Sequence, residues 1–466
     1  MVAAQPKNAD GWLILAHALD AQAKLDEADS ALQRAETLAP GLPRIMIARA
    51  KVDWRMGRFE SCAEVAASLR GDPMFGTDAT IYHGSSVRRL GRPQEAFDAL
   101  RSKATIPGVA SEYALACIDL DKPDEAVRAL EPFLSRMGEP YGPNNLQMGV
   151  RYAVLHTLGE AYEDLGEYEK AFDAYSKANG LYPPMFNEAG FRAGLPLIRD
   201  IFSRERMHSA PKPSVRTDRP VFVAAMPRSG TTLLDRLIAA HPSCGGAGET
   251  RALRAQVAEW QSPDPAAAWP RVASRLGAAD FDRIAKRYLL ETDPFGPTAL
   301  RIADKHLQNW VYVGLIAMAF PDARVIHIHR NLMDTGISCF ERLEPGAIPW
   351  STRLDWIGLA LRGAEELMQY WKENAPIAFL DVEYENLVRN PEAESRRIIS
   401  FLGLPWDDAC LTPHKRRDGQ LAPPPTLGTD QASRPINDKS IGRAARFGSL
   451  LDPLREALDR PVMATA

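Results

Sequence analysis

The chain has 466 residues, of which 45% are hydrophobic and 25% are charged. A chain this apolar buries enough surface to offset its ordering entropy, so disorder over most of its length is excluded. Lys and Arg number 56 against 60 Asp and Glu, a net charge of −4 that argues against an overall polybasic protein for nucleic acid or anionic membranes.

The length predicts two or three domains, at about 100–200 residues per domain. The start, Met1–Lys7, has no charged stretch leading into an apolar one, and no apolar run approaches the ~20 residues of a membrane helix. The cysteines are few, odd in number and far apart, which favours reduced thiols over a disulfide framework: Cys62, Cys117, Cys244, Cys339 and Cys410. We therefore expect a soluble, cytoplasmic protein with no membrane span.

The first two hundred residues contain an internal repeat. Segments 9–40 and 152–184 share a spacing of large and small apolar residues, and one small residue recurs at steps of 34, 34, 30 and 45, at Ala28, Cys62, Ala96, Ala126 and Ala171. Small residues let the two helices of a hairpin approach closely, and large ones fill the groove against the next hairpin. The segments resemble tetratricopeptide (TPR) repeats, which implies an α-helical solenoid that binds a protein or peptide. Unrelated amphipathic helices are the alternative.

The end of the solenoid is expected soon after Pro183 and Pro184. One more amphipathic helix, over 186–202, is expected to close the array, and the proline-rich polar stretch 209–214 is typical of a linker. We predict a solenoid with its closing helix over 1–205, a linker over 206–219 and a second domain over 220–466.

A loop at residue 226 has the pattern of an anion-binding loop. The apolar run 220–225 suits a buried parallel strand, and 233–238 has helical periodicity. Strand, small-residue loop and helix together direct backbone N–H groups at a phosphate. Aligned on Gly230, the first Gly of a nucleoside-triphosphate loop becomes Ala225 and its Lys becomes Thr231, which disfavours a kinase or an ATPase.

The loop sequence Pro-Arg-Ser-Gly-Thr-Thr, with Leu-Leu and His241-Pro242 after it, resembles the 5′-phosphosulfate loop of sulfotransferases. The resemblance implies an α/β P-loop-like domain with a mainly parallel sheet. It also implies the co-substrate 3′-phosphoadenosine 5′-phosphosulfate (PAPS), without a metal. The residues that would hold the phosphosulfate are Arg228, Ser229, Gly230, Thr231 and Thr232. A generic anion loop is the alternative for this motif taken alone.

Segments further along the chain extend the resemblance to a 3′-phosphate site. The alternating run 323–329 is followed by Arg330, with Ser338 eight residues later on a predicted helix. A terminal phosphate suits a bidentate guanidinium together with a hydroxyl donor. Tyr384 fits the family's late strand and helix and is included among the nucleotide-binding residues. Segment 440–447 resembles a Ser-x-Gly-Arg motif and implies added cations at Arg443 and Arg446, with an exposed basic turn as the alternative.

The segment Gly248-Glu249-Thr250-Arg251 resembles the Glu-Thr-Arg of tyrosylprotein sulfotransferases, at the same spacing from the loop arginine. The resemblance implies that Glu249 is the catalytic base and that Arg251 contacts the acceptor. This chain has Gly248 where that family has a second acidic residue, so a preference for acidic sites does not carry over. A carboxylate favoured by a helix dipole is the alternative for Glu249.

Asp304-Lys305-His306 follows another apolar strand and resembles the family's Asp-Lys segment. Lys305 would then stabilise the leaving group, with Arg228 counted among the catalytic residues and His306 on the acceptor side; a solvated lysine is the alternative. His327 and His329 alternate onto one face of a strand. Because no third ligand is apparent, we predict core or neighbouring-site histidines rather than a zinc site.

The combined prediction is a PAPS-dependent sulfotransferase that acts on an acceptor hydroxyl. The resemblance favours a protein tyrosine, with the TPR array recruiting a protein or peptide acceptor. The same chemistry on a carbohydrate, lipid or small-molecule hydroxyl is the first alternative. A non-catalytic TPR scaffold with a nucleotide-sensing domain is the second, and homo-oligomerisation is left open.

Overall fold

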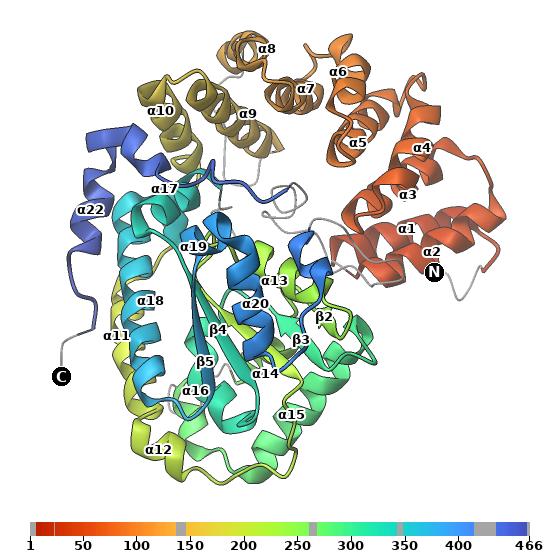
Figure 1. Cartoon of the computed structure of the whole chain (residues 1–466). Helices are drawn as coiled ribbons and strands as arrows, with labels where there is room; N and C mark the ends of the chain where they lie inside the picture. The colour runs from red at the N-terminus through yellow and green to blue at the C-terminus, as the bar shows by residue number, and fades with distance from the viewer. Residues whose placement is uncertain are drawn as a thin grey trace. The chain divides into compact units, whose positions relative to one another are not determined.

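The computed structural model describes residues 6–22, 24–136, 146–260, 268–342, 348–413 and 435–463. The chain divides between Pro183 and Pro184 into two compact units (Figure 1). Among the described residues, no helix combines the length and the apolar character that crossing a bilayer requires.

The first unit consists of successive helix pairs. The repeating small residues lie at equivalent places on the second helix of each pair, and Ala28, Cys62, Ala96, Ala126 and Ala171 are each 0% exposed. The predicted repeat packing is confirmed. The pairs are α1 (Ala9–Ala21) with α2 (Leu25–Leu38), α3 (Pro43–Arg55) with α4 (Phe59–Leu69), α5 (Gly76–Arg89) with α6 (Pro93–Arg101), α7 (Pro107–Asp119) with α8 (Pro123–Arg136), and α9 (Leu146–Asp164) with α10 (Tyr168–Asn179).

The turns within the pairs repeat a backbone conformation as well as a sequence position. The second residue after α3, α5 and α9 is a glycine with a φ of 74°, 77° and 76°, at Gly57, Gly91 and Gly166. Glycine adopts this left-handed conformation at little cost and ends a helix cleanly. The fourth pair places Asp121, with a φ of 58°, at the same point, so the turn geometry persists where the sequence repeat is weakest.

The second unit begins with α11 (Glu188–Ile201), the helix that the sequence assigned to the solenoid. It packs on α18 (Leu354–Asn374): the rings of Phe186 and Trp356 lie 5.5 Å apart, and a Cβ on Gly363 would lie 2.6 Å from Leu195. An amphipathic pattern shows that a helix has a buried face, and not which neighbour covers it. The division between Pro183 and Pro184 therefore differs from the predicted end of the solenoid at residue 205.

The stretch predicted as a linker, 206–219, is held against the same unit. It contains the end of α12 (Arg204–Ser209), and the Ser214 hydroxyl donates to Asp282 Oδ2 at 2.6 Å. Arg216 forms an ion pair with Asp322 at 2.5 Å. A proline-rich, polar stretch can thus be fixed on the surface of a folded unit by hydrogen bonds and ion pairs, as this one is, and need not be a linker.

A five-stranded parallel sheet in the order β2-β3-β1-β4-β5 forms the centre of the second unit. Its strands are β1 (Pro220–Ala224), β2 (Cys244–Gly246), β3 (Arg301–Asp304), β4 (Arg324–His329) and β5 (Ala378–Glu383). The glycine-containing segment Cys244–Gly246 forms β2 at the sheet edge, where Cys244 is paired with Arg301. A Cβ on Gly245 would lie 2.5 Å from the Phe295 carbonyl oxygen, so close backbone packing explains this glycine-containing strand.

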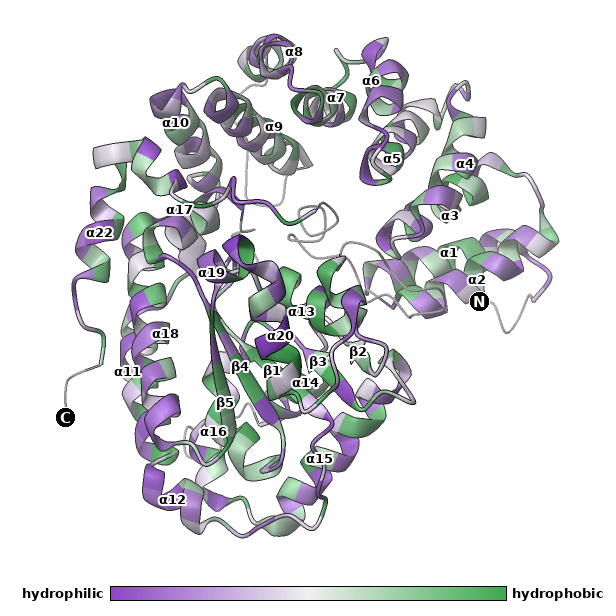
Figure 2. Cartoon of the chain, viewed as in Figure 1, coloured by the Kyte–Doolittle hydropathy of each residue, from purple (hydrophilic) through white to green (hydrophobic). Residues whose placement is uncertain are grey.

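Helices cover both faces of the sheet. The helices α13 (Thr231–Ala240), α19 (Tyr384–Arg389) and α20 (Pro391–Phe401) share a core with Val223 and Ile326. On the other face lie α15 (Ala278–Thr292), α16 (Asn309–Ala319) and α18, and Phe222 contacts the ring of Tyr288 at 5.3 Å. The central strands are mostly hydrophobic in Figure 2, as expected for a sheet buried on both faces.

The remaining described helices lie around this framework. They are α14 (Ala252–Ala258), α17 (Leu332–Arg342), α22 (Asp452–Leu458) and the 3₁₀ segments Arg271–Arg275, Asp293–Phe295, Pro349–Thr352, Asp408–Leu411 and Arg443–Leu451. Because all five strands are parallel, the segments that follow them meet at one edge, which is where open α/β sheets bind ligands.

Candidate active site

The predicted anion loop connects β1 to the start of α13. Gly230 precedes the helix with a φ of 94°, and a Cβ there would lie 2.4 Å from Tyr384 Cδ2. Arg228 is also left-handed, with a φ of 68°, a conformation that costs a non-glycine residue about 1–3 kcal/mol. No side chain among the described residues caps the helix start. The loop is therefore built so that backbone N–H groups remain for a phosphate.

Arg228 connects the loop with the predicted 3′-phosphate segment. Its Nε donates to Ser338 Oγ at 3.1 Å, although the two residues are 110 positions apart in the sequence. Burial lowers the pKa of Arg228 to about 10, and the neighbouring cations Arg342 and Arg330 act in the same direction. A guanidinium held among like charges favours an anionic ligand, because the anion would relieve both the burial and the repulsion.

Arg330 is 7% exposed, donates hydrogen bonds to neutral carbonyl oxygens and lies 3.9 Å from the carboxylate of Asp334. Nη1 donates to the Arg228 carbonyl oxygen at 3.2 Å and Nη2 donates to the Ser440 carbonyl oxygen, while Nε has no partner among the described residues. The guanidinium lies 5.1 Å from the ring centroid of Tyr384. Four residues that the sequence assigned to the nucleotide site are thus in contact in the structure: Arg228, Arg330, Ser338 and Tyr384.

Asp334 fixes the C-terminal segment beside Arg330, a role that the sequence did not suggest. Its carboxylate accepts hydrogen bonds from the backbone N–H of Gly442 at 2.6 Å and of Ala444 at 2.8 Å. Arg443 forms an ion pair at 2.8 Å with Glu341, which is fully buried. Arg443 therefore lies near the site with a carboxylate partner, whereas Arg446 is exposed and makes no ion pair to the site residues in the described part of the chain.

Glu249 and Lys305 are in direct contact, with 2.7 Å between Lys305 Nζ and Glu249 Oε1. Lys305 is 2% exposed, which excludes the alternative of a solvated lysine, and Glu249 is a third exposed. The pairing follows from the sheet, because the Lys305 N–H donates to the Gly248 carbonyl at 2.8 Å and so continues the ladder of β2 and β3. The partly exposed carboxylate of Glu249 can therefore contact a substrate, and the buried ammonium of Lys305 lies directly against it.

Two predicted acceptor-side residues lie next to this pair. His306 has its pKa lowered to about 4, first by burial and then by the cations Arg254, Lys305 and Arg251. Its Nδ1 accepts from the Gln308 N–H at 3.2 Å, so this neutral ring carries its proton on Nε2. Arg251 and Arg254 are exposed. Arg254 was missed, because a lone arginine on a predicted helix is usually a solvated one.

Two buried carboxylates lie behind Lys305. Burial raises the pKa of Asp304 to about 6, although its carboxylate accepts from Tyr288 Oη at 3.0 Å and from Asn309 Nδ2 at 3.0 Å. Burial also raises the pKa of Asp235, on α13, to about 6. Asp235 was not predicted, and its one signal is a charge inside the otherwise apolar helical run Leu233–Ile238.

The histidine pair of β4 behaves as the strand alternation predicts. The rings of His327 and His329 stack at 5.4 Å, and His327 Nδ1 lies 2.7 Å from Asp381 Oδ1. They line a hollow of about 160 Å³ together with Ser229 and Arg330. Among the described residues, no group of three His, Cys, Asp or Glu side chains is placed to hold a metal ion.

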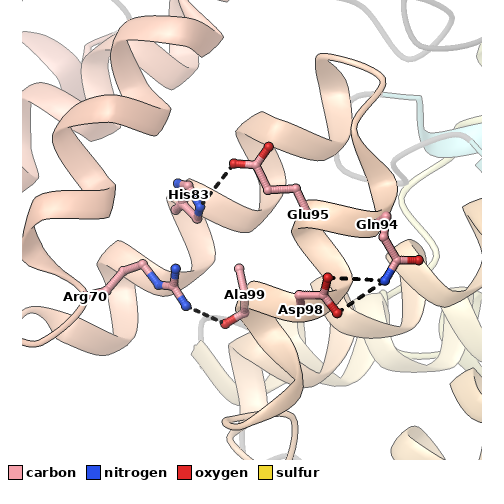
Figure 3. A pocket seen from close by; sticks show the side chains of 6 residues that line it. All are labelled: Arg70, His83, Gln94, Glu95, Asp98 and Ala99. Carbon is pink, nitrogen blue, oxygen red and sulfur yellow. Dashed lines mark hydrogen bonds and ion pairs between the residues drawn. The ribbon is translucent and has the colours of Figure 1, made fainter.

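The solenoid has a hollow of its own, of about 520 Å³ (Figure 3). Its polar side chains interact with each other: His83 lies 3.8 Å from Glu95, Gln94 donates to Asp98 at 3.2 Å, and Arg70 donates to the Ala99 carbonyl at 3.1 Å. The polar side chains of this hollow are thus satisfied by contacts within the solenoid.

Comparison with known proteins agrees with the division of the chain into a helical repeat unit and an α/β unit. The model of the Sulfotransferase family matches residues 220–408, and the model of the Tetratricopeptide repeat matches residues 152–184. The first match contains the loop, the Glu249–Lys305 pair and Arg330.

Similar proteins include an uncharacterized protein of Aquifex aeolicus, 28% identical over 73% of this chain and 44% of its own length. The protein-tyrosine sulfotransferase A of Caenorhabditis elegans is 26% identical over 48% of this chain and 60% of its own. The chain thus spans about half the length of these relatives. The sulfotransferase domain of a Synechococcus PCC 7002 olefin synthase is 20% identical with a TM-score of 0.35, over 51% of this chain and 98% of that domain.

Proposed function

We propose that the chain, which combines a tetratricopeptide repeat with a sulfotransferase-family domain, transfers a sulfuryl group from PAPS to an acceptor hydroxyl. The observation that carries the proposal is that an uncapped helix start, a group of buried and half-buried arginines and a carboxylate–lysine pair lie at one edge of the sheet. The residues fit the nucleotide, because Arg330 Nε is a buried donor without an acceptor among the described residues and the helix start at Gly230 has no side-chain cap there.

In this proposal each group of residues has a distinct task. The loop residues Arg228–Thr232 hold the 5′-phosphosulfate, and Arg330 with Ser338 holds the 3′-phosphate. Glu249 takes the proton of the acceptor hydroxyl as the new O–S bond forms. Lys305 stabilises the negative charge that collects on the bridging oxygen as its bond to sulfur breaks.

We further propose a protein tyrosine as the acceptor. Support comes from the Glu249-Thr250-Arg251 segment and from the similarity to proteins named protein-tyrosine sulfotransferases. The solenoid would supply the binding surface for the acceptor protein, the default role of such arrays.

The first test is isothermal titration of the full chain with adenosine 3′,5′-bisphosphate. We expect micromolar or tighter binding, and no heat at high micromolar nucleotide would reject both the transfer and the nucleotide-sensing alternatives.

The second test is transfer of label from [³⁵S]PAPS to a cell extract that is then separated into protein, glycan and lipid. Label on protein, released as tyrosine sulfate after hydrolysis, supports the proposed acceptor, and label in another fraction replaces it. Glu249→Gln should lower turnover about 10²–10⁴-fold while nucleotide affinity is retained. Unchanged turnover would remove Glu249 from the mechanism.

A further inference from the structure

Asp235 occupies a position that the proposed chemistry does not yet explain. It lies on the second turn of α13, directly after the anion loop, and is 5% exposed. Its Oδ1 accepts no hydrogen bond within the described part of the chain. An ionisable group buried with so little compensation is costly, which makes its location informative.

The carboxylate of Asp235 lies over the end of β2. An ideal Cβ on Gly246 would lie 3.5 Å from Asp235 Oδ1 and 3.8 Å from Oδ2. Gly246 is paired with Ala303, two residues before Lys305, and precedes Glu249 by three residues. The carboxylate is therefore placed at the two strand ends that carry the ion pair.

The ion pair itself creates a need for a second carboxylate. Lys305 is 2% exposed and pairs with Glu249. A base that takes the acceptor proton becomes neutral, so Glu249 cannot both do its work and balance Lys305. Removing one partner of a buried pair leaves an uncompensated buried charge, which is destabilising.

We propose that Asp235 is a positioning residue that balances the charge of Lys305 while Glu249 is engaged with the acceptor. The inference rests on the proposed function. No bond is made or broken at Asp235, which keeps Lys305 protonated and in place behind the leaving oxygen.

The charged groups that act on Asp235 come from three sides. Lys305 favours its ionised form, as does Arg236 on the same helix, whereas Asp304 and Glu249 oppose it. Since the pKa of Asp235 is about 6, the balance is present at neutral pH and is lost as the pH falls below about 6.

A double-mutant cycle on melting temperature tests the pairing without any turnover. At pH 8 we expect Asp235→Asn to melt no lower than the wild type, and Glu249→Gln to melt slightly lower. The double variant loses the carboxylates of Glu249 and Asp235 near Lys305 and should melt lower than the two single shifts together predict. The matched control is Glu249→Gln with Asp322→Asn, a surface aspartate paired with Arg216, for which the shifts should add.

Kinetics supply the second reading. Asp235→Asn should lower kcat about tenfold or more and leave the affinity for adenosine 3′,5′-bisphosphate within about twofold of the wild type. It should also remove the inflection near pH 6 from the dependence of kcat on pH. Asp235→Glu should recover part of the lost kcat. Additive melting shifts, or a wild-type pH profile in Asp235→Asn, would overturn the inference. If the wild type binds nucleotide but transfers nothing, the proposed function falls, and the melting cycle still decides whether Asp235 balances Lys305.

Discussion

The solenoid and the α/β unit each bury arginines, and they treat them in opposite ways. Arg49 of the solenoid is 9% exposed and lies among three carboxylates, with 2.8 Å to Glu36, a direct contact with Asp29 and 3.8 Å to Asp53. Its pKa is raised by these partners even though burial opposes it. In the α/β unit, Arg228 and Arg330 donate hydrogen bonds to a hydroxyl and to carbonyl oxygens, and Asp334, 3.9 Å from Arg330, already accepts two backbone N–H hydrogen bonds.

This difference in hydrogen-bonding and ion-pair partners distinguishes a structural arginine from one that is placed to bind an anionic ligand. A buried guanidinium needs an anion, and where the chain supplies one the charge is neutralised and the helices are joined. Where burial and neighbouring cations lower the pKa, as at Arg228, binding an anionic ligand would relieve the repulsion between the cations. The two classes should therefore respond oppositely to removal of the charge.

The largest effect is expected at the structural arginine. Arg49→Met leaves buried carboxylates uncompensated, so we expect a loss of about 3–5 kcal/mol in the free energy of unfolding, with the smaller value favoured because Arg58 still pairs with Asp53 at 2.6 Å. Denaturant unfolding measures it, and the exposed Arg34→Met on α2 is the control. Nucleotide affinity should not change, and a weakened affinity would contradict the distinction.

Arg330→Met should show the opposite pattern. We expect the affinity for adenosine 3′,5′-bisphosphate to fall about 30–1000-fold, equivalent to about 2–4 kcal/mol, because a buried charge partner of the phosphate is removed. Adenosine 5′-phosphosulfate, which lacks the 3′-phosphate, serves as the matched ligand and should lose no more than about threefold. Equal losses for both ligands would place Arg330 outside the 3′-phosphate site, and a large drop in stability would make it structural like Arg49.

Gly230→Ala tests whether the anion loop depends on its backbone. The φ of 94° and the 2.4 Å approach of a Cβ to Tyr384 both oppose a side chain, and we expect about 1–3 kcal/mol of destabilisation with about tenfold weaker nucleotide binding. Gly277→Ala is the control, since a Cβ there meets nothing within 4 Å. Wild-type affinity in Gly230→Ala would show that the loop adapts and that the arginines alone determine binding.

The sequence predicted the site residues that are recognisable from their immediate neighbours in the chain, and it missed those that depend on contacts between distant segments. Arg330 and Lys305 were found because each follows a strand directly, and Gly230 was found because it ends the short loop between β1 and α13. The contact between Glu249 and Lys305 depends on β2 lying beside β3, and the glycines of β2 hid that strand. Asp235 was missed because a charge on an amphipathic helix usually marks the solvent face, and the packing of Gly246 against it depends on strand order.

The smallest effect expected, and the one most specific in sign, is the pH dependence of Asp235→Asn. The pKa of Asp235 is raised to about 6, above its unfolded value of about 3.9. The stability that its neutral form contributes is thus full below about pH 4 and lost as the pH rises through 6.

Replacing the carboxylate by an amide should therefore raise the free energy of unfolding at pH 8 by about 1–3 kcal/mol and make little difference at pH 4–5. Asp322→Asn provides the opposite sign, because Arg216 lowers the pKa of Asp322, and its small loss should appear at pH 8 and fade in acid. Denaturant unfolding across this range measures both. A gain from Asp235→Asn that still grows with each pH unit at pH 8 would mean that Asp235 remains neutral there, and it could then not balance the charge of Lys305.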